Sequence, residues 1–243
     1  MFKSKLIIKN TLYLYSSFAL NQLLRIIYIV LVARLIGPEL YGKLSYGQAW
    51  YLSFLPFCML GLGAILIRAV SINRDKTREI VNQIIAVRLI SIIIVSVCST
   101  LVGLYFNDDS QIKLLLIIFS VAIVGRGLWM WCENMFIAYE LTFHKLKLDN
   151  IFRPLELFFG ITLALTTQSI ILIAIGHALV WLFQGIVGYW LINKKIQPIK
   201  PEWNYAATKG LLIQGAPMGG ALVLDTLMLQ IVFIIYKALG AAN

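Results

Sequence analysis

The stretch "ARLIGPELYGKLSYGQAW" occupies residues 33–50 and lies between two long apolar runs. The pair Gly37-Pro38 ends the first run, because glycine commonly follows the last turn of a helix and proline starts a new one. The stretch "KALGAAN" (237–243) ends another apolar run in a similar way, with a basic residue shortly before a glycine. The chain is therefore expected to consist of long apolar helices, and to use the same helix ending twice.

Composition restricts the class of protein. Of the 243 residues, 60% are hydrophobic and only 13% are charged, which is too little polar surface to cover a soluble core. Apolar runs of about 20 residues, the length of a helix that crosses a bilayer, recur along the chain. We therefore expect an all-α polytopic membrane protein.

Seven apolar segments predict seven transmembrane helices, separated by polar or glycine- and proline-containing turns. The stretch "HKLKLDN" (144–150) is expected to be one of these connections, between the fourth and fifth segments. The segments cover approximately residues 11–36, 44–70, 82–106, 111–139, 151–167, 169–192 and 208–236.

The distribution of basic residues predicts the orientation. With the N-terminus in the cytoplasm, most of the 21 lysines and arginines fall on the cytoplasmic side, as the positive-inside rule requires. The opposite side receives only Arg34, Lys43, Lys113 and Lys237. The net charge of +10 is then a signal of membrane topology rather than of nucleic-acid binding. The apolar run near the N-terminus is too long for a cleaved signal peptide, and it contains the polar residues Asn21, Gln22 and Arg25.

The sequence gives no motif for covalent chemistry or for a metal. Cys58, Cys98 and Cys132 each lie within an apolar run and form no CxxC pair, so we expect them to be small buried residues. The only imidazoles, His144 and His177, are far apart in the chain. We therefore predict that the protein is not an enzyme and binds no metal.

The repeated helix ending suggests an internal repeat. Aligning Gly37 with Gly240 pairs Arg34 with Lys237 and Gln22 with Asp225. Six helices then form one unit and the seventh begins a second unit in the same orientation. Parallel repeats of this kind form the two halves of many transporters, with the substrate between them.

The residues also resemble a known family. The N-terminal "NTLYLYSSFALNQLLRIIYIVLVARLIGPE", the stretch "RAVSINRDKTREIVNQIIAVRL" and the C-terminal "LIQGAPMGGALVLDTLMLQIVFIIYKALGAAN" are similar to polysaccharide and O-antigen flippases. These proteins belong to the multidrug/oligosaccharidyl-lipid/polysaccharide exporter superfamily, and the resemblance covers the whole chain in order.

The resemblance implies two lobes of helices. The chain then resembles a six-helix N-terminal lobe with its cytoplasmic linker (residues 1–206), followed by the first helix of a second lobe (207–243). It looks truncated after the seventh helix, either as a gene product or as part of a longer protein.

Charged residues inside the bilayer are candidates for function, because each costs several kcal/mol unless it faces protein or water. Asn21, Gln22 and Arg25 share one face of the first predicted helix. Arg25 either forms a cationic wall for a pyrophosphate head group, which guanidinium binds in a bidentate fork, or makes an ion pair between helices.

Arg126 and Glu133 share a face of the fourth predicted helix, but they are too far apart to bond each other. Each therefore needs another partner or water, and Arg126 is a candidate ligand for an anionic cargo. Gly125 beside it permits close approach of another helix. Trp129 and Trp131 either stack on sugars, anchor the helix at the membrane interface or pack within the protein.

Asp225 lies in the seventh predicted helix after "GAPMGG" (215–220), where Pro217 is expected to kink or unwind the helix. Its carboxylate either takes a proton or sodium ion during the transport cycle or forms a salt bridge to Arg25 or Arg126.

Four further residues are expected to have structural roles. Arg88 is expected to extend to the cytoplasmic surface, Arg153 and Glu156 to pair at the membrane interface, and His177 to pack within a helix rather than relay protons.

We therefore predict a flippase that moves polyprenyl-pyrophosphate-linked oligosaccharides to the outer leaflet of the bacterial inner membrane by alternating access, for surface polysaccharide biosynthesis. The expected binding residues are Asn21, Gln22, Arg25, Arg126 and Glu133. Expected partners are the lipid-linked oligosaccharide, membrane lipids and other polysaccharide assembly proteins, with no nucleic acid and no cofactor apart from a coupled proton or sodium ion. The alternatives are a cation-coupled drug or metabolite exporter and a truncated assembly subunit that does not transport.

Overall fold

The structure of the chain is a computed structural model that describes the backbone of residues 2–74 and 77–240 and the side chains of residues 8–74 and 77–228. All regular secondary structure in these ranges is α-helical, which confirms the predicted class. The helices are α1 (Phe2–Ile36), α2 (Pro38–Met59), α3 (Leu62–Ile72), α4 (Arg78–Phe106), α5 (Ser110–Ala138), α6 (Thr142–Thr167), α7 (Ile170–Lys195) and α8 (Tyr205–Gly240).

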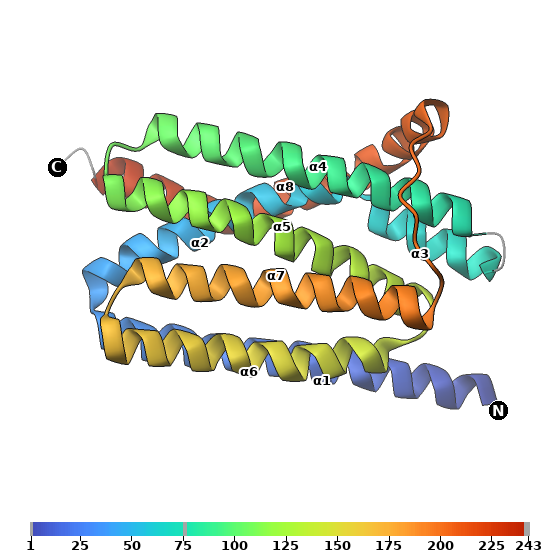
Figure 1. The fold of residues 1–243 in the computed structure, drawn as a ribbon, viewed down its shortest axis with the longest axis horizontal. Helices are drawn as coiled ribbons and strands as arrows, with labels where there is room; N and C mark the ends of the chain where they lie inside the picture. The colour runs from blue at the N-terminus through green and yellow to red at the C-terminus, as the bar shows by residue number, and fades with distance from the viewer. Residues whose placement is uncertain (1, 75–76, 241–243) are drawn as a thin grey trace.

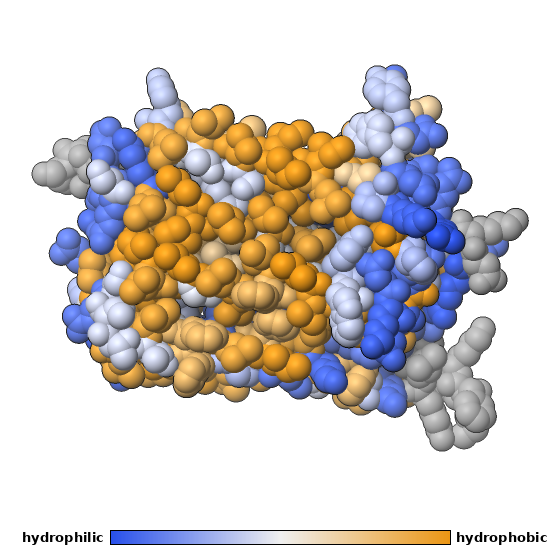
Figure 2. All heavy atoms as spheres, viewed as in Figure 1, coloured by the Kyte–Doolittle hydropathy of each residue, from blue (hydrophilic) through white to orange (hydrophobic). Residues whose placement is uncertain are grey.

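The long helices run up and down in one elongated bundle (Figure 1). The turns that follow α1, α4 and α6 lie at one end of the bundle, and the N-terminal end of α1 lies at the other end with the turns that follow α3, α5 and α7. Hydrophilic residues gather at both ends, and a broad apolar belt covers the surface between them (Figure 2). This distribution fits a bundle whose long axis crosses a membrane.

The number of spans is only partly as predicted. Among the described residues, five helices are long and apolar enough to cross a membrane, and the bent pair α2 and α3 makes a sixth candidate. Helix α6 is not among these candidates, because charged residues along its N-terminal half lower its hydropathy. The prediction of seven uninterrupted spans is therefore met in part.

Helix α6 differs from its prediction at its N-terminal end. The stretch 144–150, expected to be a connecting loop, lies within this helix, which begins at Thr142. Lys145 and Asp149 are buried there with 6% and 1% of their surface exposed. The expectation of a connection at 144–150 was wrong, because the helix begins at Thr142 and these charges have partners inside the bundle.

The predicted span 44–70 is broken between α2 and α3, which meet at an angle of 43°. Leu60 and Gly61 adopt left-handed backbone conformations at the break. Arg88 of α4 is fully buried beside it, and its Nη1 donates a hydrogen bond of 2.6 Å to the carbonyl oxygen of Cys58. The expectation that Arg88 extends to the membrane surface was therefore wrong, because it binds a carbonyl that the helix break leaves free.

Helix α8 packs against this break. A Cβ atom built on Gly61 would lie 2.2 Å from the carbonyl oxygen of Gly215, and one on Gly219 would lie 3.0 Å from the carbonyl carbon of Leu60. Only glycine permits the two backbones to come this close. Helix α8 remains helical through Pro217, so the expected unwinding there does not occur.

The two expected helix endings differ in how much of each is described. After α1, Gly37 has a φ of 82° and Pro38 begins α2. The corresponding ending after α8 falls at Gly240, and residues 241–243 lie outside the described residues.

Asp109 begins α5 at the end of the bundle opposite the N-terminus. Its carboxylate accepts hydrogen bonds from the backbone N–H groups of Gln111 and Ile112 and lies 2.9 Å from Nζ of Lys43. The hydrogen bond from Lys43 and the two backbone donors lower the pKa of Asp109. The turn between α4 and α5 is thereby fixed to the start of α2.

Aromatic and aliphatic residues form the core between the helices. Trp129 and Trp131 of α5 are almost completely buried, which favours the packing role over an anchor at the membrane interface. Cys58 and Cys132 are buried as expected, but Cys98 is exposed, because it lies on the outer face of α4.

The close contact at Gly61 predicts a stability effect. Gly61→Ala places a side chain in a left-handed conformation, which costs about 1–2 kcal/mol, and pushes it into the backbone of Gly215. We expect a lower melting temperature in detergent, measured by thermal unfolding. In the control, Gly42→Ala, the new Cβ has no atom within 4 Å, and a gain of about 0.5–1 kcal/mol is expected. Equal melting temperatures for the two variants would contradict the packing described here.

Candidate functional site

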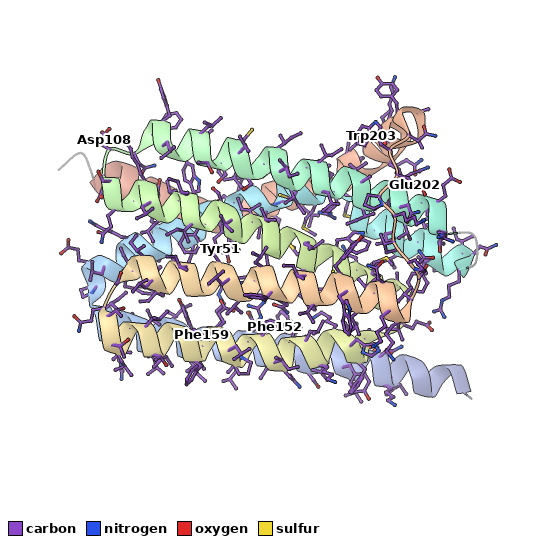
Figure 3. The ribbon with its side chains drawn as sticks, in the orientation of Figure 1. Tyr51, Asp108, Phe152, Phe159, Glu202 and Trp203 are labelled. Atoms are coloured by element: carbon purple, nitrogen blue, oxygen red, sulfur yellow. The ribbon has the colours of Figure 1, made fainter. Side chains whose placement is uncertain are left out.

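A cavity of about 560 Å³ lies within the bundle between α1, α2, α5, α6 and α7. Tyr51, which lines it from α2, lies near the middle of the long axis of the bundle (Figure 3). The polar and charged residues of its wall include Asn21, Gln22, Arg25, Ser45, Gln48, Arg126, Glu133, Lys145, Asp149, Arg153, Glu156 and His177. The cavity therefore has a strongly charged wall inside a bundle whose outer surface carries an apolar belt.

All five residues predicted to bind the substrate line this one cavity. Asn21, Gln22 and Arg25 come from α1, and Arg126 and Glu133 come from α5. The five residues come together only in the tertiary structure, because α1 and α5 are far apart in the sequence. Their role in binding stays a prediction.

Four charged residues of alternating sign lie along one face of α6. Lys145, Asp149, Arg153 and Glu156 are spaced by four, four and three residues, so they fall on the same side of the helix. This face is turned into the cavity. Lys145 and Asp149 were expected in a connection between two helices, so this pattern was not predicted, although the spacing of the four charges is visible in the sequence.

Lys145 and Asp149 form the centre of a buried polar network. The ammonium group of Lys145 lies 2.9 Å from Oδ2 of Asp149, 3.1 Å from Oε1 of Glu133 and 2.7 Å from Oγ of Ser17. Asp149 also accepts hydrogen bonds from Ser17 and from the amide of Gln184. The network joins α5 and α6 by ion pairs and adds α1 and α7 through the neutral side chains of Ser17 and Gln184, so the buried charges have both opposite charges and hydrogen-bond partners, as burial requires.

A second group joins α6 to α7. Nη1 of Arg153 lies 2.5 Å from Oε2 of Glu156, and Oε1 of the same carboxylate lies 2.7 Å from Nδ1 of His177. Arg153 and Glu156 do pair, but they line the cavity rather than a membrane interface. His177 is also more than a packed helix residue, since its other ring nitrogen, Nε2, lies 3.2 Å from the hydroxyl of Tyr51.

Trp181 holds two guanidinium groups on its ring. Cζ of Arg126 lies 3.8 Å from the ring centroid and Cζ of Arg153 lies 3.5 Å from it, within the range of cation–π attraction. The contact is possible because α5 and α7 approach closely at Gly125, where a Cβ atom would lie 2.4 Å from the backbone nitrogen of Leu182. The close approach expected at Gly125 is confirmed.

Two of the cavity's cations have no carboxylate partner. Lys145 and Arg153 are paired with Glu133, Asp149 and Glu156, whereas within the described part of the chain no ion pair joins Arg25 or Arg126 to an acidic residue. The side chain of Arg25 is exposed and that of Arg126 is half-buried. The cavity can therefore accept an anion without displacing an existing pair.

Asp225 lies apart from this site. It is on an exposed face of α8 and does not line the cavity. The salt bridge to Arg25 or Arg126 that was one of its two predicted roles is not formed among the described residues. Its role as a proton or sodium site stays a prediction.

The described residues contain no group of three His, Cys, Asp or Glu side chains placed to hold a metal ion. The arrangement instead combines unpaired guanidinium groups, aromatic rings and buried hydrogen-bond donors, which suits noncovalent binding of an anion.

Comparison with known proteins gives one match. A family model described as "Polysaccharide biosynthesis protein" matches residues 7–243. No curated protein and no solved structure matches the chain.

The network around Lys145 predicts a large effect on stability. Lys145→Met removes the cation between Asp149 and Glu133 and leaves buried carboxylates unpaired, which typically costs about 3–5 kcal/mol. We expect a lower midpoint in chemical unfolding of the purified protein. The double variant Lys145→Met/Asp149→Asn should recover part of the loss, because it removes one of the unpaired charges. A single variant as stable as the wild type would show that the network is not a buried ion pair.

Proposed function

The chain belongs to the polysaccharide biosynthesis protein family, which is a family of transporters within the multidrug/oligosaccharidyl-lipid/polysaccharide exporter superfamily, and we propose that it is a flippase for lipid-linked oligosaccharides. Its cargo would be a polyprenyl-pyrophosphate sugar unit that moves from the cytoplasmic to the outer leaflet of a bacterial inner membrane, for surface polysaccharide biosynthesis.

The observation that carries this proposal is the pair of unpaired guanidinium groups in the cavity. Arg25 and Arg126 are far apart in the sequence, on α1 and α5, but they line the same cavity. Among the described residues, neither has a carboxylate within ion-pair distance. A guanidinium group presents its N–H donors in a fork that matches phosphate oxygens. A pyrophosphate between two such groups would compensate their positive charge, which is costly to leave uncompensated in a bilayer.

The surroundings of the two arginines suit the rest of the cargo. The hydroxyl and amide groups of Ser45, Gln48 and Gln22 on the cavity wall are donors and acceptors for sugar hydroxyls. The polyprenyl chain would remain in the bilayer against the apolar belt (Figure 2). Only the pyrophosphate and its sugars then need a polar path across the membrane.

The transport mechanism we propose is alternating access, without covalent chemistry. In this proposal residues 1–206 form one lobe and residues 207–243 begin the second lobe, so that the cavity opens to one side of the membrane at a time. Asp225, on the exposed face of α8, would exchange a proton or a sodium ion during this cycle.

The proposal predicts the effect of removing either arginine. A hydrogen bond to a charged group contributes about 1.5–3 kcal/mol, so Arg25→Ala and Arg126→Ala should each slow flipping of an isoprenyl-pyrophosphoryl sugar by roughly tenfold to a hundredfold. The rate is measured in proteoliposomes that contain the reconstituted protein. Arg34→Ala is the matched control, since Arg34 is exposed at the end of the same helix as Arg25 and outside the cavity.

Two outcomes would contradict this function. If both cavity variants flip the lipid as fast as the Arg34→Ala control, the cationic cavity does not bind the cargo. If the wild type instead exports a lipophilic cation and leaves the pyrophosphate lipid in place, the chain is a drug exporter of the same superfamily.

We also propose that the N-terminus lies in the cytoplasm, and this predicts the sidedness of two loops. Asp108 and Trp203 are exposed at opposite ends of the bundle (Figure 3), and most basic residues flank the end that carries Trp203. In a Cys98→Ser background, Asp108→Cys should react with an impermeant maleimide added outside intact cells, and Trp203→Cys only after the cells are opened. The reverse pattern would invert the proposed topology.

A further inference from the structure

His177 has an environment that fixes which of its ring nitrogens carries a proton. Trp181 Nε1 donates a hydrogen bond of 3.0 Å to Nε2 of His177. Because an indole N–H is a donor only, Nε2 has to be the acceptor, and the proton of the neutral ring has to be on Nδ1. This nitrogen lies 2.7 Å from Oε1 of Glu156, an ion-pair contact whose geometry is not that of a hydrogen bond, and an ionised carboxylate can only accept. The observed contacts therefore belong to a neutral imidazole.

A second proton on His177 is incompatible with the contact to Trp181. In the imidazolium both nitrogens are donors, so the Nε2–H and the indole N–H would point at each other. The hydroxyl of Tyr51 lies 3.2 Å from Nε2 and can rotate so that its oxygen accepts a hydrogen bond from the Nε2–H group. The indole has no acceptor and can only move away. Protonation of His177 thus frees Trp181.

Trp181 is also the residue that holds the guanidinium groups of Arg126 and Arg153 on its ring. Movement of the indole therefore changes the position of both groups. Nε of Arg153 is buried and has no hydrogen-bond partner among the described residues, so this side chain has a donor available for a ligand once it moves.

We propose that His177 is a proton-binding group whose protonation is coupled through Trp181 to anion binding in the cavity, so that the protonated cavity binds a pyrophosphate diester more tightly. The inference rests on the proposed function and adds a regulatory group to the same site. Trp181 acts as a positioning residue, because it works through the arginines that it holds.

The charges around His177 give the sign of this coupling. Glu156 and Arg153 face it from α6, Tyr51 faces it from α2, and Arg126 lies beyond the indole on α5. In the empty cavity the carboxylate of Glu156 favours an imidazolium, and the two guanidinium groups oppose it. A bound anion compensates this charge, so anion binding and proton binding favour each other, and the linkage is reciprocal.

The first test determines the protonation state of His177 directly. The chain has only two histidines, so His144→Gln leaves a single histidine signal in the spectrum of ¹⁵N-histidine-labelled protein in nanodiscs. We expect the neutral ring to carry its proton on Nδ1. Addition of a pyrophosphate diester at constant pH should increase the fraction of molecules with a protonated ring. A ring that carries its proton on Nε2 would overturn the inference, whatever the protein transports.

The second test measures the coupling. The probe is a short-chain isoprenyl-pyrophosphoryl N-acetylglucosamine, a diester whose charge is constant over the range of about pH 5 to 8 in which histidines change charge. The Kd of the wild type should be at least about fivefold lower near the acidic end of this range than near the basic end, which is at the low end of typical coupling effects.

Matched variants separate the proton site from other groups in the cavity. In His177→Gln the Kd, whatever its value, should no longer differ between the two ends of the pH range. In Trp181→Phe, which keeps an aromatic ring for the arginines but has no N–H donor, the dependence should be weaker than in the wild type. His144→Gln, outside the cavity, should behave as the wild type.

The outcomes distinguish the inference from the function on which it rests. Binding that is lost in Arg126→Ala but has the same Kd at both ends of the pH range would leave the flippase proposal intact and overturn the coupling. A probe that binds at neither pH would overturn both. A pH dependence that persists in His177→Gln would assign the proton to another group and overturn the inference.

Discussion

The structure depends on one constraint, which is that a charged side chain at bilayer depth has to meet an opposite charge, a polar backbone group or water. The charged residues that line the cavity satisfy it in part by pairing with one another. Lys145 lies between Asp149 and Glu133, and Glu156 lies between Arg153 and His177. Two of these contacts join α6 to its neighbours, Lys145–Glu133 to α5 and Glu156–His177 to α7, so the same contacts that make the charges tolerable also hold the walls of the cavity together.

The same constraint accounts for the break between α2 and α3. A bent helix in an apolar environment leaves carbonyl groups without intrahelical donors, and the buried guanidinium of Arg88 binds one of them, at Cys58. At this break the backbone of α8 comes into close contact with the chain, because Gly61 and Gly215 have no side chains to separate them. Arg88 is therefore a structural arginine, and its role is opposite to that of Arg126, whose charge has no acidic partner among the described residues and faces the cavity.

Reasoning from the sequence found the cavity's α1 and α5 walls but missed much of the α6 and α7 walls. Arg25 and Arg126 were recognisable because each stands alone in an apolar run. Lys145 and Asp149 were assigned to a loop, because a cluster of charges normally ends a membrane helix. The regular spacing of four, four and three residues from Lys145 to Glu156 was the signal that could have corrected this assignment. No comparable signal marked His177 and Trp181, whose partners lie on other helices.

The sequence by itself determined the all-α class, the membrane-length helices, most helix boundaries and the family, because hydrophobicity, glycine–proline punctuation and motif order are local properties of the chain. Only the tertiary structure decided which charges are paired and which remain available to a ligand. Asn21 lies on α1 and Glu133 on α5, with three helices between them in the sequence, and they share a cavity because α1, α5 and α6 pack together. Pairing energy depends on distances across helices, and hydropathy along one helix contains no information about them.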